Sequence, residues 1–198
     1  MPDRKDGAYL LTVLSPIMGG QTQGVAHAAA IRATLRDLGK RKDTPLARIP
    51  MLHLARWVVI DDVRSQGSPA REEHLRSKYL LFTADFDGDE PTGFLESLLE
   101  AVPDLAHSLW KHCVGFPGVK DRDAFCRYIE RCRIETGLPV AAYGTYTLPE
   151  VLRALDVQRR MLAFIKSNQG KPAADLRPAF EAFLQELAAA PQPTPVFI

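Results

Sequence analysis

The chain has 198 residues, of which 46% are hydrophobic and 25% are charged, and its formal net charge is +1. This length is sufficient for one large domain, whereas each of two small domains would bury too little surface to be stable. The nearly balanced charge excludes the strongly basic surface that non-specific binding to nucleic acid or to an anionic membrane requires.

Short apolar stretches and the cysteine content indicate a cytoplasmic protein. Apolar runs such as 58–60 and 79–82 are far shorter than the roughly 20 residues of a membrane-spanning helix, and the charged N-terminus does not resemble a signal peptide. Cys113, Cys126 and Cys132 have no CxxC spacing, so neither a zinc site nor a thioredoxin motif is indicated. Reduced, mostly buried thiols are typical of the cytoplasm.

Hydrophobic periodicity predicts the secondary structure. Runs rich in apolar, β-branched and aromatic residues predict strands, and apolar residues at a spacing of three or four predict helices. In chain order the prediction is strand 8–14, helix 25–38, strands 51–60 and 79–84, a helix from 91, helical pieces 105–113 and 124–134, strand 138–147, and helices 149–165 and 176–187. Segment 63–78 contains glycine, proline and many charges, which favour a loop or a short frayed helix.

This order of elements predicts an α+β fold with a ferredoxin-like βαββαβ core. Such a core has a four-stranded antiparallel sheet with helices on one face, here with extra C-terminal helices. Trp57, Leu81 and Tyr143 make both faces of that sheet too apolar for solvent, so we expect a homodimer or coverage by the C-terminal helix. Residues 1–190 form one predicted domain, and the proline-rich residues 191–198 form a tail that is either disordered or docked.

The acidic run after the third predicted strand has two interpretations. Asp85, Asp87, Asp89 and Glu96 stand at positions 1, 3, 5 and 12 of a loop of the EF-hand type, but the glycine is at position 4 instead of 6. A strand-to-helix turn whose carboxylates cap the next helix is the better interpretation, and no metal is expected. Acid–base use of Asp85 or Asp87 at the strand end is the next alternative.

Polar residues on the second predicted strand hint at a pocket. Strict alternation places His53 and Arg56 on opposite faces, so a shared site needs a β-bulge or a position at the strand end. In such a site Arg56 would hold an anionic or oxyanionic group, and His53 or a carboxylate would be the acid or base. The alternative is that Arg56 only pairs with a carboxylate such as Asp85.

Other polar features have simpler interpretations. The segment 19–24 precedes a helix and could hold an anion, but it is neither GxGxxG nor a Walker sequence, which favours a flexible turn. His107 and His112 are five residues apart and do not share a helix face as a metal-binding pair would. His112 is either a structural histidine, a general base or a lone haem ligand. Cys113 or Cys126 would need a histidine brought close by folding to act as a nucleophile.

Three stretches together resemble a group of largely uncharacterised bacterial and fungal proteins related to the dimeric α/β-barrel (ferredoxin-like) superfamily. They are HLARWVVI at 53–60, LLFTADFDGD at 80–89 and WKHCVGFP at 110–117. That superfamily includes cofactor-free monooxygenases, isomerases and cyclases, stress-response barrels, dye-decolourising peroxidases and chlorite dismutases. If haem is the cofactor, the resemblance makes His112 or His107 the axial candidate. Of the Gly-x-x-Asp-Gly motif of dye-decolourising peroxidases, however, this chain has only 86–88.

The sequence therefore predicts an oxidoreductase-like enzyme acting on a small, largely apolar molecule. The expected site residues are His53, Arg56, Asp85 and Asp87, in a pocket between the sheet and its helices or on the sheet face. The expected cofactor is none or haem, and the expected partners are a small-molecule ligand and a second copy, not nucleic acid or a membrane. The alternative is a non-catalytic ligand-binding or assembly module that uses its apolar sheet face.

Overall fold

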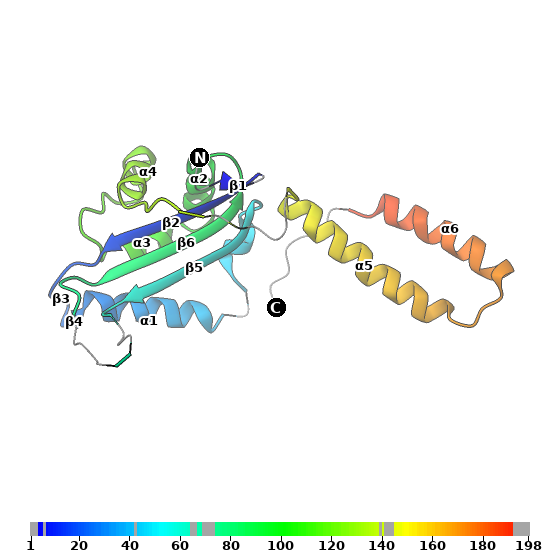
Figure 1. Ribbon diagram of the computed structural model, residues 1–198, viewed down its shortest axis with the longest axis horizontal. Helices are drawn as coiled ribbons and strands as arrows, with labels where there is room; N and C mark the ends of the chain where they lie inside the picture. Colours follow the sequence, from blue (N-terminus) through cyan, green and yellow to red (C-terminus); the bar gives the residue numbers. More distant parts are fainter. Residues whose placement is uncertain are drawn as a thin grey trace.

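The computed structural model describes residues 4–5, 7–41, 43–63, 67–68, 74–138, 140 and 145–191. Within them the chain forms a body, made of an antiparallel sheet backed by helices, and a hairpin of two long helices that projects from this body (Figure 1). Among these residues, no helix combines the length and the apolar character needed to cross a membrane.

Most predicted elements are present, with ends shifted by a few residues. The strands are β1 (Arg4–Lys5), β2 (Ala8–Pro16), β3 (Gln21–Thr22), β4 (Val25–Ala26), β5 (Leu52–Ile60) and β6 (Tyr79–Asp87). The helices are α1 (His27–Gly39), the 3₁₀ helix η1 (Pro45–Arg48), α2 (Pro91–Ala101), α3 (Pro103–Trp110), α4 (Arg122–Arg131), α5 (Leu148–Asn168) and α6 (Ala173–Ala189). Much of the predicted loop 63–78 lies outside the described residues.

The sheet corrects the predicted ferredoxin-like core with four full strands. Three nine-residue strands run antiparallel in the order β2–β6–β5, only the two-residue β1 lies beyond β2, and β3–β4 form a separate two-stranded sheet. Of the predicted fourth strand 138–147, residues 139 and 141–144 lie outside the described part, and the rest are in no strand. The free edge of β2 is used instead by β1 and by an isolated bridge from Val13 to Arg133 after α4.

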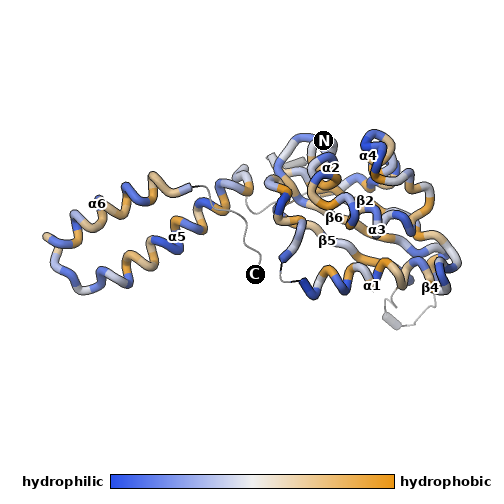
Figure 2. The backbone as a smooth tube through the Cα atoms, turned by 180° about the vertical axis from the view of Figure 1, so that it is seen from behind, coloured by the Kyte–Doolittle hydropathy of each residue, from blue (hydrophilic) through white to orange (hydrophobic). Residues whose placement is uncertain are grey.

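One face of the sheet is buried by helices. Along β2 and β6 every second residue is buried, which is the pattern of strands with one covered face. Phe82 of β6 meets Trp110 of α3 with ring centroids 5.4 Å apart, and Phe86 stacks on Phe94 of α2 at 4.3 Å. Trp110 also contacts Phe125 of α4. These aromatic contacts form the core that holds the helices against the sheet, and Figure 2 shows α3 in front of the strands.

The opposite face, called the open face below, remains accessible in the described chain. Its side chains come from alternate positions of the three long strands, and in the register Leu10 of β2 and Leu54 of β5 flank Asp85 of β6. One step further along the sheet, Thr12 and Arg56 flank Thr83, and after a second step Leu14 and Val58 flank Leu81. Leu54 and Val58 expose 57% and 38% of their surface. The open face therefore combines apolar side chains with charged and polar groups that extend from the Asp87 end to the middle of the sheet.

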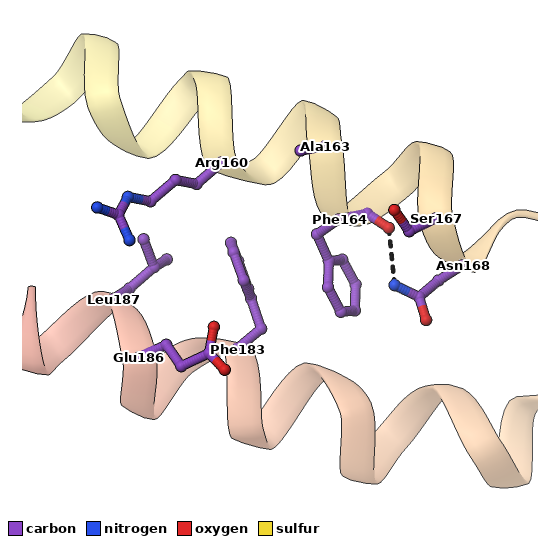
Figure 3. Close-up of a pocket in the computed structure, with 8 residues that line it drawn as sticks. All are labelled: Arg160, Ala163, Phe164, Ser167, Asn168, Phe183, Glu186 and Leu187. Carbon is purple, nitrogen blue, oxygen red and sulfur yellow. Dashed lines mark hydrogen bonds between the residues drawn. The ribbon is translucent and has the colours of Figure 1, made fainter.

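The α5–α6 hairpin contributes a separate small core. Thr147 and Glu150 form a capping box at the start of α5, which explains why the helix begins there. Phe164 of α5 stacks on Phe183 of α6 with centroids 4.7 Å apart (Figure 3). On the far side of α5, Leu162 is 52% exposed. One domain over 1–190 stays a prediction, and residues 192–198 of the predicted tail lie outside the described residues.

Candidate functional site

A β-bulge brings His53 to the charged end of the open face. Leu52 pairs with Phe86 and Leu54 pairs with the neighbouring Asp85, so His53 is the extra residue between them. A bulge re-aims the side chains on its strand. The sequence predicted that His53 and Arg56 could share a site only through such a bulge. The bulge is present, and it lets His53 reach the side chain of Asp87 on β6.

His53 and Asp87 form a nearly buried hydrogen-bonded pair. The Nε2 atom of His53 lies 2.6 Å from Oδ1 of Asp87, and the two side chains expose 10% and 19% of their surface. An ionised carboxylate can only accept, so Nε2 of His53 donates its N–H to Asp87 in this contact. A carboxylate that holds an imidazole in one tautomer and orientation is the arrangement used for general bases.

Asp87 also connects this site to the projecting hairpin. Its second oxygen, Oδ2, accepts the backbone N–H of Leu148, the first residue of α5, at 2.8 Å. The carboxylate thus lies at the positive end of the α5 dipole, which favours a negative charge there. The sequence interpretation had acidic residues of this run capping the following helix, but α2 has no side-chain cap and no acidic residue in its first turn. The carboxylate of Asp87 serves α5 instead.

Asp85 and Arg56 extend the site along the open face. Asp85 lies between two leucines, and this burial raises the pKa of its carboxyl above the ordinary value, although the charges of His53 and Arg56 act in the opposite direction. A carboxyl with a raised pKa is more easily protonated and can donate a proton. Arg56 pairs in the register with Thr83, one step from Asp85. The four predicted residues therefore lie between the Asp87 end of the sheet and its middle, where Arg56 is.

The site contains one group that sequence reasoning missed. The N–H of Leu148 is 61 positions away from Asp87 in sequence, and no local pattern announces their contact. The capping box at Thr147 and Glu150 was a signal for the start of a helix, but not for the carboxylate that it meets. The calcium alternative has no support, since the described residues contain no cluster of three or more potential metal ligands among His, Cys, Asp and Glu.

The two histidines considered for haem are placed differently. His107 packs its ring against Phe116, and His112, which is 6% exposed, lies against His27. The pocket beside His112 has Met18 and Val25 in its lining, but the polar side chains and Lys111 between them interrupt the wide apolar slot that a porphyrin needs. The surroundings of His112 do not fit a haem.

Cys113 and Cys126, the two cysteines considered as nucleophiles, are not activated. Cys113, Cys126 and Cys132 are all free thiols. Burial raises the pKa of Cys113 to about 12 and also raises the pKa of Cys126. Since the thiolate is the reactive form, both of these side chains are inert at neutral pH.

Comparison of the chain with protein family models, with curated proteins and with solved structures found no match. The resemblance to the dimeric α/β-barrel superfamily stays a prediction without support from these comparisons. The geometry around His53 and Asp87 is therefore the basis on which a function has to be argued.

Proposed function

We propose that this protein is an enzyme that performs acid–base chemistry on a small, largely apolar molecule bound on the open face. The observation that carries the proposal is the 2.6 Å hydrogen bond between His53 and Asp87 at the charged end of an apolar surface. Two polar side chains this nearly buried lose contact with water, and their hydrogen bond does little more than offset that cost. The contact between His53 and Asp87 has a function if it holds the imidazole in the orientation of a general base.

Each residue has a distinct role in this proposal. The leucines of the open face bind the apolar part of the substrate, and the guanidinium of Arg56 holds its anionic or oxyanionic group. His53 is the base, and Asp87 stabilises the imidazolium that forms when the ring takes up a proton. Asp85, whose carboxyl has its pKa raised by burial, is the second group placed to exchange a proton with the substrate. Oxidation of the substrate rests on the sequence resemblance and stays a prediction.

The alternative of a binding or assembly module has one observation in its favour. The far side of α5 carries Leu155, Leu162 and Ile165, which expose 50%, 52% and 52% of their surface. An exposed apolar stripe on a projecting helix is a typical docking element. The homodimer and the cytoplasmic location both stay predictions.

A matched pair of ligands tests the role of Arg56. 2-Naphthoate and neutral 2-naphthylmethanol share the apolar ring and differ in the anionic group. We expect the Arg56→Ala variant to bind 2-naphthoate about tenfold more weakly, as expected for one lost charge contact, and to bind the alcohol unchanged. Ring resonances of His53 in an NMR titration would report the binding position.

Arg122→Ala is the control, because Arg122 is exposed and pairs with Glu100 away from the open face. It should leave both affinities unchanged. If Arg56→Ala binds the two ligands as the unaltered protein does, or if His53 does not respond, the proposal of a small-molecule site on this face is wrong.

A further inference from the structure

Two histidines outside the site above meet at the opposite end of the sheet. His27 is the first residue of α1, His112 follows α3, and their Nδ1 atoms lie 2.9 Å apart. The carbonyl of His112 accepts the N–H of Met18, just beyond the end of β2, whereas Asp87 pairs with Ala8 at the start of β2. Because the two histidines are 85 residues apart in sequence, only folding brings them together.

The contact between the two rings determines where their protons lie. One Nδ1 must donate and the other must accept, because two lone pairs or two N–H groups at this distance would repel. In the neutral pair, one Nε2 therefore carries a proton and the other does not. One additional proton makes both Nε2 atoms donors without breaking the Nδ1 contact. Neither Nε2 has a hydrogen-bond partner among the described residues.

The pair lines a pocket of about 610 Å³ between α1, the β3–β4 hairpin and the end of α3. Among the described residues, its lining contains one ammonium group, two hydroxyls and one amide but no carboxylate: Lys111, Thr22, Thr34 and Gln23. The first turn of α1 has no side-chain cap and no acidic residue, so its partial positive charge adds to that of the pocket. His112, more than nine-tenths buried, contributes its ring to this donor-rich surface.

Charge decides between an anion and a metal ion as the ligand. Two close imidazoles could also bind a transition metal. Burial first, and then the charges of Lys111 and His27, hold the pKa of His112 below its ordinary range, and a bound cation would meet the same repulsion from Lys111. Arg76 and Lys78 line a second pocket on the other side of His27, and Lys78 pairs at 3.6 Å with Asp61. A cation would meet repulsion from these groups, whereas an oxyanion would relieve it.

We propose that the pocket at His27 and His112 binds a phosphate group, such as that of a phosphate monoester, through the two Nε2–H groups and Lys111. Binding takes up one proton, because the neutral pair presents only one Nε2–H donor. Affinity then rises up to about tenfold for each unit by which the pH falls between the pKa values of the free and the bound pair. This site is separate from His53 and does not depend on the acid–base function proposed above.

NMR titration of the full chain with inorganic phosphate tests the proposal. We expect the ring resonances of His27 and His112 to shift and saturate while those of His53 and His74 stay in place. The affinity, expressed per phosphate dianion so that the ligand's own ionisation is removed, should be higher at about pH 6 than at about pH 8. Lys111→Gln, at an exposed position, should weaken binding several-fold, and Lys120→Gln is the matched control that should not.

A second variant separates loss of the site from loss of the fold. His27→Gln leaves the buried His112 in place and should remove the pH dependence of phosphate binding. Parallel shifts of all histidines that potassium chloride reproduces would mean an adventitious ion only and overturn the proposal. So would equal affinities at the two pH values. Saturable binding of Ni²⁺ at the pair, with no response to phosphate, would show that this is a metal site instead.

Discussion

Replacing Asp87 with alanine removes the acceptor for two donors from distant parts of the chain. The carboxylate accepts from His53 at 2.6 Å and from the N–H of Leu148 at 2.8 Å. A hydrogen bond to a charged group contributes about 1.5–3 kcal/mol, and loss of an acceptor at a helix start costs about 1 kcal/mol. Because His53 would remain nearly buried without this partner, we expect the free energy of unfolding to fall by about 3 kcal/mol.

Equilibrium unfolding in urea measures this loss. Asp87→Asn keeps one carbonyl oxygen as an acceptor and should lose roughly half as much. Asp37→Ala is the control, since Asp37 is 74% exposed and pairs with Lys40 on the surface of α1, where about 0.5 kcal/mol is expected. If Asp87→Ala loses no more than this control, the carboxylate does not hold the site together and the reasoning is refuted.

Three further substitutions test other parts of the structure. Burial raises the pKa of Asp85 above its ordinary value of 3.8, so its ionised form opposes folding at neutral pH and this penalty disappears as the pH falls through the raised folded pKa. Asp85→Asn should therefore stabilise the protein at about pH 7 and not at about pH 3, and a melting temperature unchanged at both would contradict this. Leu54→Glu on the open face should convert a homodimer to a monomer in sedimentation velocity, and an unaltered protein that is itself monomeric would disprove the dimer. Phe183→Ala should open a cavity worth about 3 kcal/mol between α5 and α6 and speed hydrogen exchange there, while the amides of β6 stay protected. Equal acceleration in β6 would show that hairpin and body unfold together.

Local patterns were sufficient to predict most helices and the three long strands. Apolar residues at helical spacing, such as Phe94 and Leu98, face the core whatever the topology is, because one turn of a helix repeats over a few residues. The strand of Tyr79–Asp87 was equally clear, since its alternate residues pack against helices. The pattern that marks a helix or a strand involves only residues close together in sequence, so it can be recognised in a single sequence.

The topology of the sheet edge was not predictable in the same way. The segment around 138–147 has the composition of a strand, but β1 and the bridge at Arg133 use the edge of β2 that a fourth strand would need. Which segment pairs with an edge depends on the length and direction of every connection before it. Composition contains no information on that competition.

The candidate site also has features that the sequence predicted and features that only the tertiary structure determined. Sequence alone singled out His53, Arg56, Asp85 and Asp87, because polar residues among apolar strand residues are visible as a pattern. Only tertiary structure decided that a bulge puts His53 within hydrogen-bond distance of Asp87. It also decided the pairing of His27 with His112, which no pattern announced. The physical reason is that hydrogen bonds between side chains depend on distances of a few ångströms, and these are set by packing between segments far apart in the chain.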